Sequence, residues 1–259
     1  MRYVSIIILL LSLLLPPAAS HAAAQTGAAG QFVNAMTQGP AEMLAITQDE
    51  KGVLWMGTAE GLYSYDGYVA YAHPRIGHVG GERIYSLCRI GHELWLGTDN
   101  GLIVFDYRSG SYRQVGQTPH APIRSMLCNG RSLYLGVGDQ LFAYHLDHQS
   151  IKLIAQTHAT IYALAQWQGH LQVGTLRGLF ILDNHRLQRQ LLPASQQPLV
   201  NALLNDGRSL WIGTEGQLYR MDRTHGGQPY VVPGMAGNSA KALVTDKQGN
   251  LFAGTDNGL

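Results

Sequence analysis

The residues that could carry out chemistry are scattered along this chain of 259 residues. The sequence contains no GxSxG nucleophile elbow, no HExxH zinc motif, no P-loop and no GxGxxG after a strand. Its 11 histidines lack the close spacing that metal ligation favours. His73 and His78 share one loop, where solvent-exposed histidines are a simpler interpretation than zinc ligands. We therefore expect no catalytic residue, no metal ion and no cofactor.

Acidic residues recur at one type of turn and could ring a single face of the molecule. Such a ring would attract a cation, but Arg177 occupies the same type of turn and weakens that interpretation. Asp and Asn tolerate the positive φ that tight turns demand, so turn formation explains most of the set better. The acidic residues are Glu60, Asp99, Asp139, Glu215 and Asp256.

A binding site is a better prediction than a catalytic site. Tyr, Arg and Asn side chains around a concave mouth can stack on a polar ligand, such as an oligosaccharide, and hydrogen-bond to it. Ordinary solvated loop residues remain the alternative for each position. The predicted ligand-binding residues are Arg83, Tyr85, Arg124, Tyr162 and Asn201, with His73, Arg75 and His120 on the loops that lead into them.

An internal repeat must position these side chains. Segments such as LWMGTAEGLYSYD, LWLGTDNGLIVFD and LWIGTEGQLYRMD recur along the chain and align on one glycine. Successive anchor glycines are 40, 39, 38, 39 and 41 residues apart, which makes six near-regular copies. The anchors are Gly57, Gly97, Gly136, Gly174, Gly213 and Gly254.

Each repeat divides into four short apolar strands separated by Asp, Asn and Gly, and helical periodicity is missing throughout. Four antiparallel strands in about 40 residues predict the blade of a β-propeller, so the fold class is all-β. About 5.5 blades are present, and we expect them to be part of a seven-bladed propeller. The predicted blades are residues 42–80, 82–119, 122–157, 160–195 and 198–235, with a partial blade at 238–259.

The segment Ile46–Pro74 resembles the two-component regulator propeller repeat, whose pattern is roughly I-x-x-D-x-x-G-x-L-W-I-G-T-x-x-G-L-x-x-Y-D-G. The pattern weakens in the third and fourth repeats, where Val137 replaces the Thr, Gln140 a Gly and Gln172 the Trp. The resemblance implies the periplasmic sensor region of a hybrid two-component histidine kinase or a propeller-containing diguanylate cyclase. It also implies an N-terminal fragment, with the membrane span and the output module beyond these residues.

The N-terminus predicts export. Residues 1–24 combine an early Arg2, an apolar run and small residues near Ala22, which is the layout of a secretory signal peptide; an uncleaved signal anchor is the alternative. Residues 25–41 form a lead-in and a candidate closing strand, and residues 42–259 form the propeller. The charged fraction of 14% and the net charge of +1 argue against a nucleic-acid partner. We expect the periplasmic side of the inner membrane.

Two cysteines, Cys88 and Cys128, lie one position out of register on equivalent strands of neighbouring repeats. Because alternate strand positions point to opposite faces, we favour two buried free thiols over a disulfide. A recurring aromatic residue two positions before the anchor glycine is expected to pack between blades rather than to bind a ligand.

Three functions from different classes fit the sequence. The first is a ligand-sensing, dimerising propeller of a transmembrane receptor, with a homodimer in the intact protein. The second is a secreted propeller that binds carbohydrate or protein and has no output module. The third is a propeller lyase or glycosidase, against which stands the lack of paired catalytic carboxylates.

Overall fold

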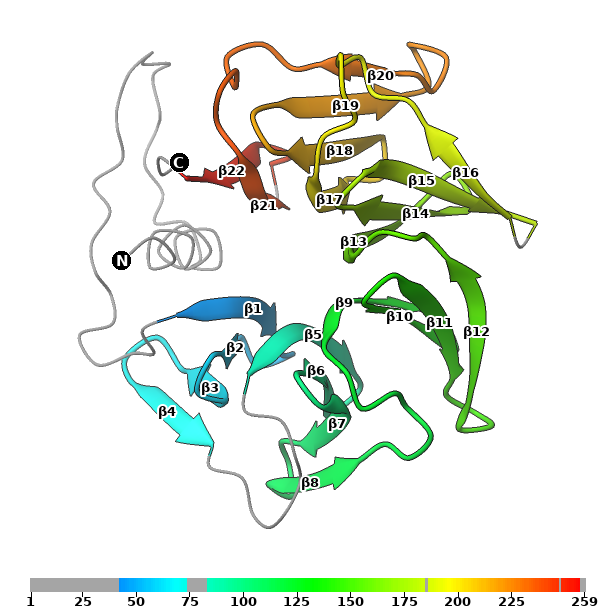
Figure 1. The fold of residues 1–259 in the computed structure, drawn as a ribbon. Helices are drawn as coiled ribbons and strands as arrows, with labels where there is room; N and C mark the ends of the chain where they lie inside the picture. Colours follow the sequence, from blue (N-terminus) through cyan, green and yellow to red (C-terminus); the bar gives the residue numbers. More distant parts are fainter. Residues whose placement is uncertain (1–41, 74–82, 185, 247, 257–259) are drawn as a thin grey trace.

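The computed structural model describes residues 42–73, 83–184, 186–246 and 248–256, which form 22 β-strands and no helix (Figure 1). The predicted signal peptide and the lead-in segment lie outside the described residues. Five antiparallel sheets have four strands each, and a sixth sheet has two. The sheets lie side by side around a common centre, with the first strand of each sheet innermost (Figure 1). The predicted all-β propeller is confirmed.

Each sheet is called a blade and numbered in chain order. Blade 1 contains β1 (Met43–Gln48), β2 (Leu54–Thr58), β3 (Leu62–Tyr65) and β4 (Ala70–His73); blade 2 contains β5 (Ile84–Ile90), β6 (Glu93–Thr98), β7 (Gly101–Asp106) and β8 (Ser111–Gln114). Blade 3 contains β9 (Ile123–Asn129), β10 (Ser132–Val137), β11 (Gln140–His145) and β12 (Ser150–Gln156); blade 4 contains β13 (Ile161–Trp167), β14 (His170–Thr175), β15 (Gly178–Asp183) and β16 (Arg186–Gln190). Blade 5 contains β17 (Val200–Asn205), β18 (Ser209–Thr214), β19 (Leu218–Asp222) and β20 (Pro229–Val231); blade 6 contains β21 (Ala240–Thr245) and β22 (Leu251–Thr255).

The hydrophobic core lies between blades, because each sheet buries its two faces against its neighbours. The recurring aromatic residues take part in it: Trp55 and Trp95 are 5% and 4% exposed. Trp55 packs with Ile84 and Phe105 of blade 2, while Trp95 packs with residues of blade 3. The expectation that this aromatic position packs between blades is confirmed at these two residues.

At several anchor glycines one blade lies very close to the next. A Cβ atom on Gly97 would lie 2.6 Å from the carbonyl oxygen of Ile123 in blade 3. A Cβ atom on Gly213 would lie 2.7 Å from the carbonyl oxygen of Ala240 in blade 6. Backbone oxygens at these distances leave no room for a side chain. Glycine therefore recurs in the repeat because the inner strand of the following blade occupies the space of its side chain.

The recurring GT step of the repeat builds the turn between the second and third strands. The Thr98 hydroxyl donates to the carbonyl of Gly101 (2.9 Å) and accepts the amide of Asn100 (3.1 Å). The amide of Asp99 donates to the carbonyl of Arg83, just before the inner strand of the same blade (3.1 Å). The hydroxyls of Thr58, Thr175 and Thr214 make the equivalent turn bonds. The turn is thereby fixed beside the start of the inner strand.

An aspartate closes the turn between the first and second strands in blades 1 and 5. Asp206 accepts the amides of Arg208 and Ser209, and its second oxygen accepts the indole Nε1–H of Trp211 at 2.7 Å. Asp49 makes the same set of bonds with its own turn and with Trp55. The Asp and Trp of the repeat motif are therefore partners in one structural unit. Because the strands alternate in direction, these turns lie at the opposite end of the blade from the GT turns.

Candidate ligand-binding site

All six inner strands carry a β-bulge at the same point. The register between the first and second strands shifts there, so that one residue in each inner strand has no partner. A bulge turns its extra side chain away from the regular pleat, and bulges are frequent at functional sites. The six bulged residues are Leu44, Tyr85, Arg124, Tyr162, Asn201 and Lys241, and we call them the bulge ring.

Four of the eight residues predicted to bind ligand belong to the bulge ring: Tyr85, Arg124, Tyr162 and Asn201. Each is half-buried or exposed at the end of its inner strand that adjoins the GT turns. Sequence reasoning missed Leu44 and Lys241. These two residues lie 13 positions before their anchor glycine, whereas the other four lie 12 positions before it. An alignment that allowed a one-residue gap would have found both.

Tyr85 and Arg124 are in direct contact across the boundary between blades 2 and 3. The guanidinium carbon of Arg124 lies 4.6 Å from the centroid of the Tyr85 ring. A cation over an aromatic face is worth about 0.5–1 kcal/mol at an exposed site. Stacking leaves the in-plane N–H donors of the guanidinium free to bind a ligand. Among the described residues, no carboxylate forms an ion pair with Arg124.

Two other cations near the bulge ring are already paired. Lys241, the ring member from blade 6, forms an ion pair with Asp256 in the GT turn of the same blade. Arg83 lies two residues before Tyr85 and pairs with Glu42 of blade 1 at 3.1 Å, which links the two blades. Both ion pairs are partly exposed and therefore contribute little stability. Arg83, predicted to bind ligand, is positioned by this contact beside the ring.

The histidines predicted for the entry loops lie in different surroundings. His73 is the last residue of β4, on the outermost strand of blade 1. Its half-buried ring lies 4.9 Å from Trp55 and 5.4 Å from Phe105, and it hydrogen-bonds the Ser64 hydroxyl at 2.7 Å. Burial lowers the pKa of His73 below its ordinary value. The structure places it between blades 1 and 2 and away from the bulge ring.

The remaining two predicted residues add less. His120 is exposed on the loop between β8 and β9, as the sequence predicts for an entry loop. Arg75 lies outside the described residues, as does His78. Among the residues that the structure describes, no group of three or more His, Cys, Asp or Glu side chains could hold a metal ion. The Tyr, Arg and Asn side chains of the bulge ring can stack on a ligand and hydrogen-bond to it.

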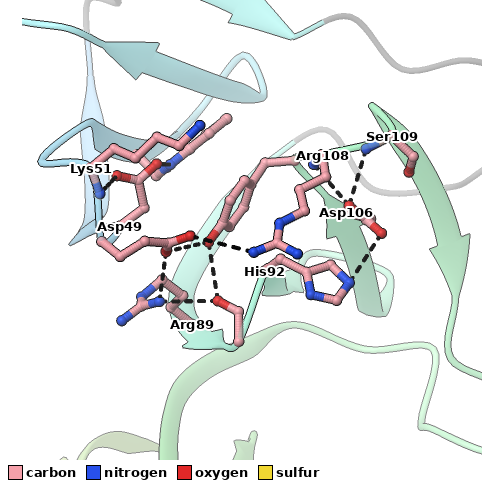
Figure 2. A network of polar contacts seen from close by, with 11 residues as sticks. Asp49, Lys51, Arg89, His92, Asp106, Arg108 and Ser109 are labelled. Carbon is pink, nitrogen blue, oxygen red and sulfur yellow. Dashed lines mark hydrogen bonds and ion pairs between the residues drawn. The ribbon is translucent and has the colours of Figure 1, made fainter.

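Figure 2 shows a polar network at the opposite end of blades 1 and 2. Glu50, in the turn of blade 1, accepts hydrogen bonds from the Tyr107 hydroxyl (2.6 Å) and from Arg89 (3.0 Å) of blade 2. Arg108 lies 3.9 Å from its other oxygen. The hydrogen bond from Tyr107, followed by weaker effects including the two arginines, lowers the pKa of Glu50 below its ordinary value. Sequence reasoning did not identify this contact.

Two solved structures that resemble the chain are extracellular domains of bacterial signalling systems. The chain is 32% identical to the extracellular domain of a one-component system, BT4673 of B. thetaiotaomicron, with a TM-score of 0.77. The match covers 86% of this chain and 32% of that one. A second structure, described as the extracellular domain of the hybrid two-component system BT4673, gives 31% identity, a TM-score of 0.76 and coverage of 85% and 31%.

A more distant likeness shows the fold alone. PorZ, a surface component of the type-IX secretion system of Porphyromonas gingivalis, is 16% identical with a TM-score of 0.62, over 84% of this chain and 31% of that one. The chain spans about a third of the length of each of these three structures. No family model matches the chain, and no curated protein matches it.

The fold and the bulge ring define the class: the chain is a β-propeller similar to the extracellular sensor regions of bacterial signalling systems. Both BT4673 structures are described as extracellular domains, which lie on the outer side of a membrane. The motif from Ile46 onward resembles the two-component regulator propeller repeat, and the similarity to the extracellular domains of BT4673 agrees with that resemblance. Among the described residues, no helix is long and apolar enough to cross a membrane.

Proposed function

We propose that this chain is the ligand-sensing propeller of a transmembrane signal-transduction receptor, exported to the periplasmic side of the inner membrane. The signal-peptide pattern of residues 1–24 and the similarity to the extracellular domains of BT4673 support the location. The output module would be a histidine kinase or a diguanylate cyclase, which the resemblance to the two-component regulator propeller family implies.

The ligand is a small polar molecule, such as an oligosaccharide, held at the bulge ring. The contact between Tyr85 and Arg124 carries this proposal. It presents an aromatic edge and free guanidinium donors side by side, supplied by two different blades. Sugar rings bind through that combination of apolar contact and directed hydrogen bonds. Tyr162 and Asn201 offer the same groups at the equivalent positions of blades 4 and 5.

Ligand would act by shifting a conformational equilibrium. A ligand that spans two inner strands stabilises one relative placement of their blades over others, by as much as its affinities for the two arrangements differ. In a homodimeric receptor, that preference would change how two propellers sit against each other and so pass through the membrane span.

Binding at the bulge ring is tested by calorimetric titration of the chain with maltose-, cello- and galacturonate-series oligosaccharides. For whichever series binds, Arg124→Ala and Tyr85→Ala should each weaken affinity about tenfold or more, because a charge-assisted hydrogen bond or an aromatic stacking surface is lost. Arg131→Ala is the matched control: this exposed arginine pairs with Asp147 in the opposite-end turn of blade 3 and should leave affinity unchanged. Equal affinity of all three variants would contradict the site.

Membrane attachment is tested separately. An antibody raised against the propeller should detect the native gene product in the membrane fraction of the source cells. A product found only in soluble periplasmic extract would replace the receptor with a secreted binding propeller. Cleavage of polysaccharide by the purified chain would instead support a lyase or glycosidase.

A further inference from the structure

The two cysteines of the chain meet at the boundary between blades 2 and 3. Cys88 lies on the inner strand β5, and Cys128 lies on the neighbouring inner strand β9. Both are half-buried free thiols that pack against the same apolar cluster, which includes Trp95 and Leu133. The two thiols are close enough to affect each other, because the neighbouring Cys128 contributes to the raised pKa of Cys88. Their proximity contradicts the expectation, drawn from the alternation of strand positions, that they point apart.

The one-residue offset is the reason they meet. Blades stack face to face, so a side chain on blade 2 that points forward meets a side chain on blade 3 that points backward. Cys88 is aligned with Leu127 in the repeat, and Leu127 points forward, into the cluster between blades 3 and 4. Cys128, the next residue along β9, points back into the cluster between blades 2 and 3. Cysteines at equivalent positions would have faced different boundaries.

We propose that Cys88 and Cys128 form a disulfide bond that joins blade 2 to blade 3 in the exported protein. The oxidant is a disulfide-bonded thiol oxidoreductase of the export compartment. One cysteine thiolate attacks the disulfide of the oxidoreductase and releases one of its thiols, which gives a mixed disulfide. The second cysteine then attacks the mixed disulfide and releases the other thiol. Two electrons and two protons pass to the oxidoreductase, and one S–S bond forms in the chain.

The surroundings of the pair determine when the bond forms. Burial, with the neighbouring Cys128 as the second cause, raises the pKa of Cys88 to about 12, so little of this thiol is ionised at neutral pH. Exchange is therefore slow once the blades have packed. Formation during folding, while the strands are still accessible, fits this environment, and the finished bond is shielded from reductants.

The disulfide would act on the same two strands that carry the cation–π contact. Cys88 follows Tyr85 by three residues on β5, and Cys128 follows Arg124 by four residues on β9. A covalent link a few residues further along both strands would hold β5 and β9 in one position relative to each other. It also closes a loop of about 40 residues, which reduces the conformational freedom of the unfolded chain.

The test compares the full chain exported to an oxidising periplasm with the same chain made in a reducing cytosol. Each sample is unfolded, its thiols are alkylated, and the alkylated thiols are counted by mass spectrometry. Because the chain has two cysteines, an intramolecular bond has one assignment. We expect no free thiol in the exported, monomeric chain and two in the reduced chain. Refolding of the reduced chain from urea in the presence of glutathione disulfide at pH 8.5 should convert the second form into the first.

A matched control moves one thiol by a single position. Leu127→Cys combined with Cys128→Ser places the second thiol on the other side of β9, toward blade 4, and should leave both thiols free under the same oxidation. The reduced wild-type chain should melt roughly 5–10 °C below the oxidised wild-type chain, and Cys88→Ser/Cys128→Ser should melt at the same temperature after either preparation. Two free thiols in the oxidised wild-type chain, a bond only between chains, or equally ready pairing in the shifted control would overturn the proposal.

Discussion

The two ends of each blade are built from the same four strands but use polar residues differently. At the end of blades 1 and 5 opposite the GT turns, polar groups satisfy one another: Asp49 and Asp206 close turns and bind Trp indoles. Glu50 gathers its partners from the adjacent blade there. At the bulge ring, side-chain type changes from blade to blade, and Arg124 has no anionic partner among the described residues. One end therefore serves stability, while the other retains groups that can bind a ligand.

The largest effect is expected at the anchor glycines, where close packing between blades supports both ends of each blade. Gly97→Ala should lower the free energy of unfolding by about 3 kcal/mol or more, because its Cβ would overlap Ser86 and the backbone of Ile123. Gly116→Ala is the control: a Cβ there meets nothing within 4 Å, so the change should stay within about 0.5 kcal/mol. Urea denaturation of both variants measures the difference. Similar stabilities would show that blade packing adapts at this point.

A substitution at the turn end should affect stability and leave ligand binding alone. Asp206→Ala removes three hydrogen bonds, including the one from Trp211, and should destabilise the chain by about 1–2 kcal/mol. Asp147→Ala removes an exposed ion pair and should cost less than about 0.5 kcal/mol. Thermal melts combined with titration of the same oligosaccharide separate the two effects. Weaker binding by a well-folded Asp206→Ala protein would show that the turn end also contributes to ligand binding, which contradicts the proposed division.

The half-buried His73 should make the stability of the chain depend on pH. Because burial lowers its pKa in the folded chain, the unfolded chain binds more protons near the ordinary histidine value. The stability due to neutral His73 is therefore complete above about pH 6.5 and decreases as the pH falls below it. Melting temperatures from pH 8 to pH 5 should fall less for His73→Gln than for the wild-type chain. Parallel curves would mean that the histidine titrates as if it were exposed.

The smallest effect is expected at Glu50. Its lowered pKa has the opposite sign from that of His73: the contribution is present above the ordinary glutamate pKa and is lost as the pH falls through the folded value. Removing its main donor with Tyr107→Phe should reduce the acid dependence of the melting temperature between pH 5 and pH 3. Tyr63→Phe, at the GT-turn end of blade 1, is the control and should leave that dependence unchanged. If Tyr107→Phe shows the same pH dependence as the wild-type chain, Glu50 does not contribute to stability through this contact.

Much of this architecture was predictable because the same sequence pattern recurs in six copies. Spacing of the anchor glycines gave the blades, and turn residues such as Thr98 and Asp99 marked the ends of strands. Four members of the bulge ring were predicted for the same reason, since one periodic position selects them. His73 was predicted on an entry loop because the sequence does not show where the fourth strand ends and the following loop begins. The structure places it at the end of β4, packed against the next blade.

By itself, the sequence determined the fold class, the repeat and the end of the blades where varied polar residues gather, because strand alternation and turn chemistry are local and recur in every copy. Only the tertiary structure decided which side chains meet across a blade boundary. Tyr85 with Arg124, Glu50 with Tyr107, and Cys88 with Cys128 all join different blades. These contacts depend on how two sheets stack face to face. The close approach at the anchor glycines and the bulges position one blade against the next. The sequence of a single repeat does not show which residue of the neighbouring blade a given side chain will contact.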